Sequence, residues 1–453
     1  MLEHQNFLYI KEKTSKNVDY YKCKYRSCKA RGIVCLNNFK ASDTPHNHEN
    51  DQTSIIRLQA RQKVVEKAKN NPTQPASEVY NSVINTERKR LSTNFSNELI
   101  GTALPTFLSC RSSMIRSRRE VLPAQPQRRE DIIVGDWCLH EGENFLLIND
   151  GEKDRIMAFG TRNSIRLLAE AKRVFMDGTF YVCPSIFAQF YTLHVIYGGK
   201  MLPVVYALLP DKTEATYTRL LEKLTEIALE FGYIFKPEMF TIDFEQAVIN
   251  AIHLLFPNAE IKGCFFHFTQ CIWKKTQAYG LQAAFEVDEE VTKTIKRLAA
   301  LPLLNPSDIE DTWMDIHGDA PPMPGMQQLI EYFVSTWLDP DTSLFDINIW
   351  NIYGVEGDRT NNRLEGWHSG LKRLIKKAHP NLFEFVDYIK QDYDNTCTTL
   401  LHITNGSYVN TQRRIYRKIN LAIRKLTDMY NAGQKTPIEF LDSVSYKLHL
   451  KSN

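Results

Sequence analysis

The sequence contains no apolar run near the roughly 18 residues that would cross a bilayer. Its first residues, MLEHQNFLYIKEK, also lack the apolar stretch of a secretory signal. Both absences predict an intracellular protein with no membrane partner. The nine cysteines are odd in number and irregularly spaced, so we expect thiols or metal ligands rather than disulfides. No serine or tyrosine nucleophile motif is present, and no covalent protein intermediate is indicated.

The charged residues are divided unevenly along the chain. The 453 residues, 43% of them apolar, are enough for about two to four domains with at least one large core. The net charge of +3 conceals a basic front part, because residues 1–130 hold 23 Lys and Arg against 12 Asp and Glu. The remaining residues hold 33 basic and 41 acidic side chains. This division predicts nucleic-acid contacts in the front part.

Four potential zinc ligands lie in two close pairs near the N-terminus, namely Cys23 with Cys28 and His46 with His48. Two thiols and two imidazoles suit a closed tetrahedral zinc site, and so short a segment needs a metal to fold. Alternating residues around the cysteines predict strands, and two histidines two apart project from one side of an extended segment. A polar loop with unrelated Cys and His is the alternative. We expect Cys35 to be a core thiol.

Residues 1–50 resemble a FLYWCH zinc finger, a small β-rich zinc module that binds DNA or protein. The matching segments are Phe7-Leu8-Tyr9, Tyr21-Lys22-Cys23, Cys28-Lys29-Ala30-Arg31 and His46-x-His48. The family usually has Trp where this chain has Tyr21. That change leaves the four ligands intact.

Residues 51–130 read as three short helices followed by a linker. Helical spacing in SIIRLQARQKVVEKAKN and ASEVYNSVI predicts the first two, and LPTFLSCRSSMIRSRRE predicts an Arg-rich third. This helix-turn-helix-like arrangement would offer Arg116, Arg118 and Arg119 to a phosphate backbone. A solvated charged helix is the alternative. VLPAQPQRRE indicates a domain boundary near residue 130.

From residue 131 the pattern predicts an α/β domain. A hairpin and a short helix precede a strand, RVFMDGTFYV, which carries Asp177. Two further strands follow, separated by a turn at Gly198-Gly199, and then a long helix. A fourth strand ends at Asp243, and after another helix AEIKGCFFH forms the fifth. This order is that of an RNase H-like sheet, in which the first and fourth strands are neighbours.

That topology would bring Asp177 and Asp243 together. Two neighbouring carboxylates repel each other, and a divalent cation removes the repulsion, so the sequence predicts a Mg²⁺ or Mn²⁺ site. A third acidic residue, Glu365, lies about one turn into the amphipathic helix predicted within TNNRLEGWHSGLKRLIKK. Lys372 and Arg373 at its end are candidate contacts for the nucleic-acid backbone.

The region of roughly residues 135 to 400 resembles the catalytic domain of Mutator-like element (MULE) transposases. The matching motifs are Met176-Asp177-Gly178-Thr179-Phe180, Pro203-Val204-Val205-Tyr206-Ala207-Leu208, Asp243-Phe244-Glu245-Gln246-Ala247, Gly263-Cys264-Phe265-Phe266-His267 and Asn361-Asn362-x-Leu364-Glu365-x-Trp367-His368. The resemblance implies a DDE transposase that uses Asp177, Asp243 and Glu365 to cleave and join DNA at terminal inverted repeats. It further implies a transposase domain over 131–400 with a helical insertion at about 281–355, double-stranded DNA as partner, a homo-oligomer and a nuclear location.

Some readings stay open. Glu245 is a second acidic candidate, although a charge in the first turn of the following helix is favoured. Cys264 and His267 resemble the family's Cys-x2-His element, where a phosphate-contacting or hydrogen-bonding role for His267 is favoured over a structural zinc. The basic amphipathic tail, 401–453, suits either DNA or a second protomer. The rival function is a domesticated, catalytically inactive DNA-binding regulator, and a ribonuclease of the RNase H group is disfavoured.

Overall fold

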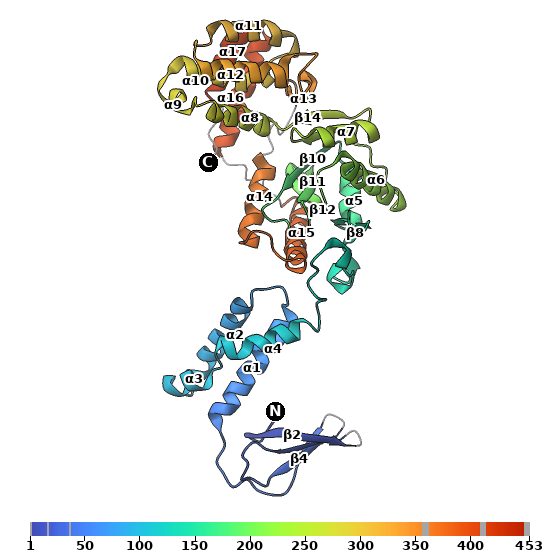
Figure 1. Cartoon of the computed structure of the whole chain (residues 1–453), viewed down its shortest axis with the longest axis vertical. Helices are drawn as coiled ribbons and strands as arrows, with labels where there is room; N and C mark the ends of the chain where they lie inside the picture. The colour runs from blue at the N-terminus through green and yellow to red at the C-terminus, as the bar shows by residue number, and fades with distance from the viewer. Residues whose placement is uncertain (1, 16–17, 36–37, 356–361, 408–413, 448–453) are drawn as a thin grey trace. The chain divides into compact units, whose positions relative to one another are not determined.

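The computed structural model describes residues 2–15, 18–35, 38–355, 362–407 and 414–447. The chain divides into two compact units, Met1–Gln125 and Pro126–Asn453 (Figure 1). In the described residues, no helix combines the length and apolarity that a bilayer crossing requires.

The first unit begins with a five-stranded antiparallel sheet in the order β1-β2-β3-β4-β5. Its strands are β1 (Leu2–His4), β2 (Phe7–Ser15), β3 (Val18–Cys23), β4 (Arg31–Cys35) and β5 (Asn38–Ala41). The small core contains Tyr9, Cys23 and Cys28, with Phe39 packed against it. Gly32 is needed on β4, since a Cβ there would lie 2.2 Å from the Phe39 ring. Cys35 is exposed, so its prediction as a core thiol is wrong.

Four helices, not the three predicted, complete the first unit. They are α1 (Gln52–Asn70), α2 (Ala76–Leu91), α3 (Asn97–Ala103) and α4 (Phe107–Arg118). Side chains of Asp51, Ser96 and Thr106 cap α1, α3 and α4. The extra helix, α3, is only seven residues long and ends at Ala103, because the next residue, Leu104, is extended ahead of Pro105. The helices α2, α3 and α4 all contact α1.

The second unit is built on a seven-stranded mixed sheet in the order β14-β13-β10-β11-β12-β9-β8. Its strands are β8 (Leu146–Asp150), β9 (Ile156–Phe159), β10 (Arg173–Thr179), β11 (Gln189–Tyr197), β12 (Lys200–Leu209), β13 (Met239–Ile242) and β14 (Glu260–Gly263). A separate small hairpin pairs β6 (Leu139–His140) with β7 (Glu143–Asn144). β13 runs parallel to both β10 and β14, and the other neighbours are antiparallel. The predicted adjacency of the first and fourth strands, β10 and β13, is confirmed.

Helices cover both faces of this sheet (Figure 1). They are α5 (Arg162–Glu170), α6 (Glu214–Glu230) and α7 (Gln246–Leu255) on one side, and α14 (Asn362–Ile375) and α15 (Leu382–Thr404) on the other. Because side chains alternate along a strand, β10 sends Met176 and Phe175 to opposite faces. Phe175 packs against Leu364 of α14. Asp177 has the same parity as Phe175 and therefore faces α14.

A helical lobe extends from the end of the sheet. It contains α8 (Phe265–Ala278), α9 (Gln282–Val287), α10 (Glu289–Ala300), α11 (Ile309–Asp319), α12 (Pro324–Phe333), α13 (Ile347–Trp350), α16 (Arg414–Asn431) and α17 (Pro437–Ser445). Short helical turns are η1 (Arg129–Asp131), η2 (Asp136–Cys138), η3 (Leu301–Leu303), η4 (Pro306–Asp308) and the π-helical η5 (Val334–Leu338). The helical character of the predicted insertion is thus observed. The fifth strand, however, ends at Gly263, and the predicted strand residues from Phe265 onward form the first turn of α8.

The C-terminal segment is part of this lobe, contrary to its prediction as a separate tail. Helix α17 packs against α10 and α11, and α16 packs against α17. Buried Arg297 of α10 binds both carboxylate oxygens of Asp442 at 2.6 and 2.8 Å and a carboxylate oxygen of Asp319 at 2.7 Å. Ile423 and Tyr430 of α16 are buried in the same core. The apolar face of the basic helix is therefore used within the chain.

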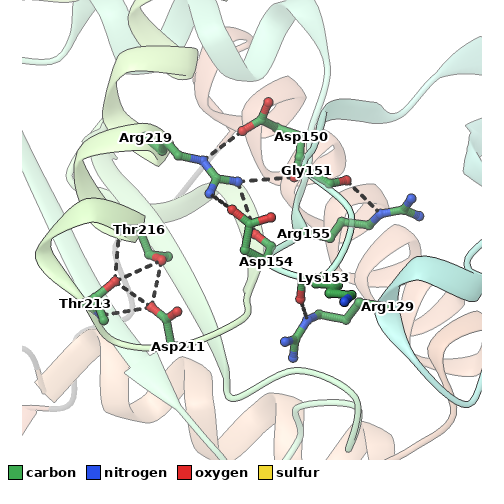
Figure 2. A network of polar contacts seen from close by, with 10 residues as sticks. All are labelled: Arg129, Asp150, Gly151, Lys153, Asp154, Arg155, Asp211, Thr213, Thr216 and Arg219. Atoms are coloured by element: carbon green, nitrogen blue, oxygen red, sulfur yellow. Dashed lines mark hydrogen bonds and ion pairs between the residues drawn. The ribbon is translucent and has the colours of Figure 1, made fainter.

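A polar network ties the first residues of the second unit to its sheet (Figure 2). Arg129 donates to the carbonyls of Lys153 and Ile186 at 2.6 and 2.9 Å. Arg155 donates to the carbonyl of Ile132 at 2.8 Å, and Arg219 of α6 binds Asp150 and Asp154 beside it. Since Arg129 belongs to this network, the boundary falls at Gln125, slightly before the predicted position.

Candidate functional site

Four side chains of the first unit converge as the sequence predicts. Sγ of Cys23 lies 3.2 Å from Nε2 of His48, and Sγ of Cys28 lies 3.4 Å from Nδ1 of His46. The two histidine nitrogens are 3.3 Å apart, and all four ligand atoms lie within 4.8 Å of one another. In the described part of the chain, this is the one cluster of three or more His, Cys, Asp or Glu that is compact enough for a metal ion.

Neighbouring groups fix the orientation of both imidazoles. Nε2 of His46 is 2.9 Å from the hydroxyl of Tyr9, while Nδ1–H of His48 donates to the carbonyl of Glu49 at 2.7 Å. Each contact leaves the opposite ring nitrogen directed at the cysteines, as outer partners of zinc ligands do. The ring of Phe7 stacks on His46 with centroids 3.7 Å apart.

The thiol chemistry also fits zinc. Burial raises the pKa of Cys23, so a thiolate at that position needs a nearby cation. At Cys28 burial acts in the same direction, but backbone N–H groups of Ala30 and Asn47 outweigh it and lower the pKa. Two sulfur and two nitrogen ligands, with both imidazole rings held in orientation, match a closed structural zinc site.

A second candidate site lies at the ends of β10 and β13. These strands pair in parallel, with Val174 opposite Phe240 and Phe175 opposite Thr241. Two residues further along both strands stand Asp177 and Asp243. The parallel register therefore brings both acidic residues to one edge of the sheet.

Asp177 is buried, and its carboxylate contacts the backbone of Gly178 and the ring of His368. Oδ1 accepts a hydrogen bond from the N–H of Gly178 at 2.8 Å, and Oδ2 lies 3.6 Å from Nδ1 of His368 on α14. Gly178 is required because a Cβ there would lie 2.8 Å from Oε1 of Gln189. His368 brings no positive charge near pH 7, because burial, followed by Lys372, lowers its pKa to about 4.

Asp243 carries a carboxylate oxygen that has no partner among the residues that the structure describes. Its Oδ1 is buried and makes no hydrogen bond within the described residues. Burial, assisted by the carboxylate of Glu245, raises the pKa of Asp243 to about 6, although Lys212 opposes the shift. Burial makes this carboxyl group hard to ionise, and a nearby cation would stabilise its charged form. The position of Asp243 therefore fits a metal ligand.

Two neutral histidines adjoin the acidic pair. His267 lies in the first turn of α8, and burial, followed by Lys274, lowers its pKa to about 4. His267 also contributes to the lowered pKa of His368, so the two imidazoles influence each other. Nδ1 of His267 and Nε2 of His368 are both buried without a hydrogen-bond partner in the described chain. Both rings can therefore bind an incoming polar group.

Glu365 is placed by its backbone alone, because its side chain lies outside the described residues. It belongs to α14, between buried Leu364 and His368, the residue that reaches Asp177. One helical turn separates positions 365 and 368. The backbone of the third predicted ligand is thus on the helix that covers the acidic edge.

A buried carboxylate anchors α14. Nε1 of Trp367 donates to the two oxygens of Asp392 on α15 at 3.1 and 3.0 Å. The hydroxyl of Tyr206 on β12 donates to the same carboxylate at 2.9 Å. Asp392 therefore joins two helices to the sheet beneath the candidate site.

Sequence reasoning missed Tyr191. Its hydroxyl is buried with no hydrogen-bond partner in the described part, and its residue pairs with Gly178 across β10 and β11. Burial raises its pKa, with Asp243 as the next largest contribution, so the hydroxyl lies in the field of the acidic pair. The antiparallel pairing sets Thr192, not Tyr191, opposite Asp177, so strand pairing alone gave no signal for this hydroxyl.

The other predicted residues near the site have structural contacts. Glu245 accepts from the hydroxyl of Tyr217 at 2.9 Å and pairs with Lys212 at 3.4 Å. It stands at the N-cap of α7, which agrees with its favoured reading as a charge at the start of that helix. Cys264 is fully buried, and within the described residues no third Cys, His, Asp or Glu completes a metal cluster with Cys264 and His267.

The predicted arginines of α4 divide into two groups. Arg116 and Arg119 are exposed. Arg118 donates to the carbonyls of Asn71 and Gln74, and thereby closes the turn between α1 and α2. On the second unit, Lys372 and Arg373 are exposed at the end of α14.

The fold and the site define a mixed α/β domain with two acidic residues at adjoining strand ends, preceded by a unit with a zinc-type cluster. The family model of the MULE transposase domain matches residues 173–271. The matched segment runs from β10 to Cys271 on α8 and contains Asp177, Asp243 and His267. None of the curated proteins compared matches the chain. Residues 173–271 are therefore similar to a MULE transposase domain.

Proposed function

We propose that this protein is a DDE-type DNA transposase that cleaves and joins strands at element ends, using Mg²⁺ or Mn²⁺. The observation that carries the proposal is the parallel register of β10 and β13, which aligns Asp177 with Asp243 inside the matched MULE region. The buried, unpartnered Oδ1 of Asp243 supports a cation at this edge. Glu365 is proposed as the third ligand.

An RNase H-like core is part of the proposal. The order β12-β11-β10-β13-β14, with β13 and β14 parallel to β10, supports it. Helical spacing supports Glu365 as well, because position 368 on the same helix touches Asp177.

The residues present would divide the chemistry among them. Divalent ions held by the three acidic residues would lower the pKa of an attacking water or 3′-hydroxyl and stabilise the departing oxygen. The N–H of Gly178 orients Asp177 so that Oδ2 faces α14. Neutral His267 and His368 offer nitrogen atoms to the phosphate or to a transferred proton.

The first unit is proposed to recognise the DNA termini. Its basic excess and the exposed Arg116 and Arg119 of α4 suit phosphate contacts. A zinc ion at Cys23, Cys28, His46 and His48 would hold a FLYWCH-type module together. Double-stranded DNA, a homo-oligomeric complex and a nuclear location belong to this proposal.

The alternative is a domesticated regulator that binds DNA but does not cut it. The same basic first unit would serve that role. The retained Asp177 and Asp243 favour the enzyme, because a scaffold released from catalysis has no need for two carboxylates at one buried edge.

A cleavage assay separates the two functions. Supercoiled plasmid carrying candidate terminal inverted repeats is incubated with the full chain and Mg²⁺ or Mn²⁺. We expect nicked and cut products from the wild type, and a loss of about 10²-fold or more in Asp243→Asn, Asp177→Asn and Glu365→Gln. Glu226→Gln is the matched control, since Glu226 is an exposed carboxylate that pairs with Lys223 on α6.

Each outcome has a clear meaning. Equal nicking by wild type and Asp243→Asn rejects the catalytic assignment. Specific binding of the repeats with no metal-dependent cutting by any protein supports the regulator.

A further inference from the structure

Two aromatic side chains are exposed immediately after the strand that carries Asp177. Phe180 and Tyr181 expose 50% and 45% of their surface, whereas the next residues, Val182 and Cys183, are buried. Two adjacent exposed rings leave apolar surface in contact with water. Because these two rings follow Asp177 directly, the exposed surface favours a ligand at this edge of the sheet.

The backbone that presents these rings is held in place. The N–H of Cys183 donates to the carbonyl of Phe180 at 3.1 Å, which closes a turn. From the loop after α14, the N–H of His379 donates to the carbonyl of Tyr181 at 3.0 Å, and its Nδ1 donates to the carbonyl of Cys183 at 2.9 Å. The rings therefore project from a fixed segment. Binding of a ligand would cost little conformational entropy there.

A lysine from a different element lies over each ring. Nζ of Lys212 is 4.4 Å from the centroid of the Phe180 ring, and Nζ of Lys372 on α14 is 5.6 Å from that of Tyr181. Lys212 also pairs with Glu245, two residues after Asp243. The rings thus lie beside all three segments that supply the proposed metal ligands. Each combines an apolar face with a cation.

We propose that Phe180 and Tyr181 form a stacking platform for unpaired nucleotides of the DNA strand held at Asp177 and Asp243. Aromatic rings in a basic groove bind single strands of any sequence, because every base has a face that can stack. Lys212 and Lys372 would meet the phosphates on either side. An intact duplex keeps its base faces within the stack, so the platform selects melted or overhanging ends. The inference rests on the proposed DNA function.

The test measures binding without cutting. Zinc-loaded full chain in buffer free of Mg²⁺ and Mn²⁺ is titrated into a duplex with a single-stranded overhang containing 2-aminopurine, and into the blunt duplex. We expect quenching of 2-aminopurine by the wild type. Phe180→Ala and Tyr181→Ala should each weaken overhang binding roughly 5- to 100-fold and abolish quenching, with blunt-duplex affinity unchanged within about twofold.

Matched variants guard against trivial effects. Tyr446→Ala removes another exposed tyrosine, which lies under Lys296 in the helical lobe, and should change nothing. Tyr181→Phe keeps the ring and should retain quenching. If an alanine variant melts at a lower temperature, Phe180→Leu and Tyr181→Leu decide, because leucine keeps apolar contacts but lacks the aromatic face.

Undiminished quenching and affinity in the alanine and leucine variants would overturn the platform, as would an equal loss on blunt duplex. A wild type that cuts DNA while ring variants bind overhangs normally would leave the proposed enzyme standing without the platform. Ring-dependent quenching with no cutting by any protein would instead retain the platform and reject the catalytic function. Binding of a protein partner at the rings would appear as unchanged affinity for every DNA.

Discussion

At the scale of the residue, Asp243 is one group that makes the stability of the second unit depend on pH. Its pKa of about 6 in the folded chain exceeds that of a free aspartate, chiefly because of burial. Above pH 6 the folded state must hold a buried charge that the unfolded chain carries in water. As the pH falls from 7 toward 4, the folded state gains a proton first, and this residue's contribution to stability rises.

We therefore expect Asp243→Asn to stabilise the protein above pH 6. The gain should reach about 1–3 kcal/mol at pH 7.5 and vanish near pH 4. Urea unfolding of zinc-loaded protein free of Mg²⁺ and Mn²⁺, followed between pH 4 and 8, measures it. Glu226→Gln, an exposed substitution, should leave the pH profile unchanged. Identical profiles for wild type and Asp243→Asn would contradict the assignment.

At the scale of the element, α4 combines a structural end with an exposed basic side chain, Arg116. Arg118 holds the α1–α2 turn through two carbonyls, whereas Arg116, two residues earlier, has its side chain exposed. Arg118→Ala should destabilise the first unit by about 1–3 kcal/mol, because the carbonyls lose a charged donor. Arg116→Ala should leave stability within about 0.5 kcal/mol and lower the salt dependence of DNA binding by about one phosphate contact.

Chemical denaturation and a salt titration of DNA binding read these effects separately. The two substitutions remove the same side chain from the same helix, so each is the control for the other. Equal destabilisation by both, or an unchanged salt slope in Arg116→Ala, would show that this division of α4 is wrong.

The elements also show where sequence reasoning reaches its limit. The adjacency of β10 and β13 followed from strand order, and the Cys23 to His48 cluster followed from ligand spacing. Nothing local distinguishes Arg118 from Arg116, because its role depends on a turn 44 residues earlier in the chain. Helix α3 was missed because seven residues give little periodicity.

The site was predicted as far as residue type and order allow. Asp177 and Asp243 stood out as charges at the ends of apolar strands. The role of His368 depends on how α14 packs across the sheet, which spacing along one helix does not determine. The C-terminal helices were predicted as a tail, because an apolar helix face does not by itself identify the surface that it packs against.

At the scale of the whole molecule, the two compact units should respond differently to loss of zinc. The sheet of the first unit has a very small core around Tyr9, Cys23 and Cys28, so we expect its folding to depend on a bound metal. The second unit has a large core of its own. We expect one bound zinc per wild-type chain and none in Cys23→Ser.

Chelation should abolish hydrogen-exchange protection in strands β1 to β5 and leave protection of β10 to β12 unchanged. Zinc content by elemental analysis and exchange measured by mass spectrometry provide the readouts. Cys35→Ser is the matched control, because Cys35 is exposed and lies outside the cluster. Full zinc occupancy in Cys23→Ser would contradict this assignment.

The hydrogen bonds between α14 and Asp392 fix the rotation of α14 about its own axis before any ligand binds. Trp367 and Tyr206 approach the same carboxylate from a helix and from the sheet. Rotation of α14 about its axis would break the bonds from Trp367, while the bond from Tyr206 would still hold Asp392 and α15 on the sheet. The position of α14 over the acidic edge is therefore set during folding, and a site built this way would lose its geometry abruptly, when the second unit melts, rather than by gradual drift.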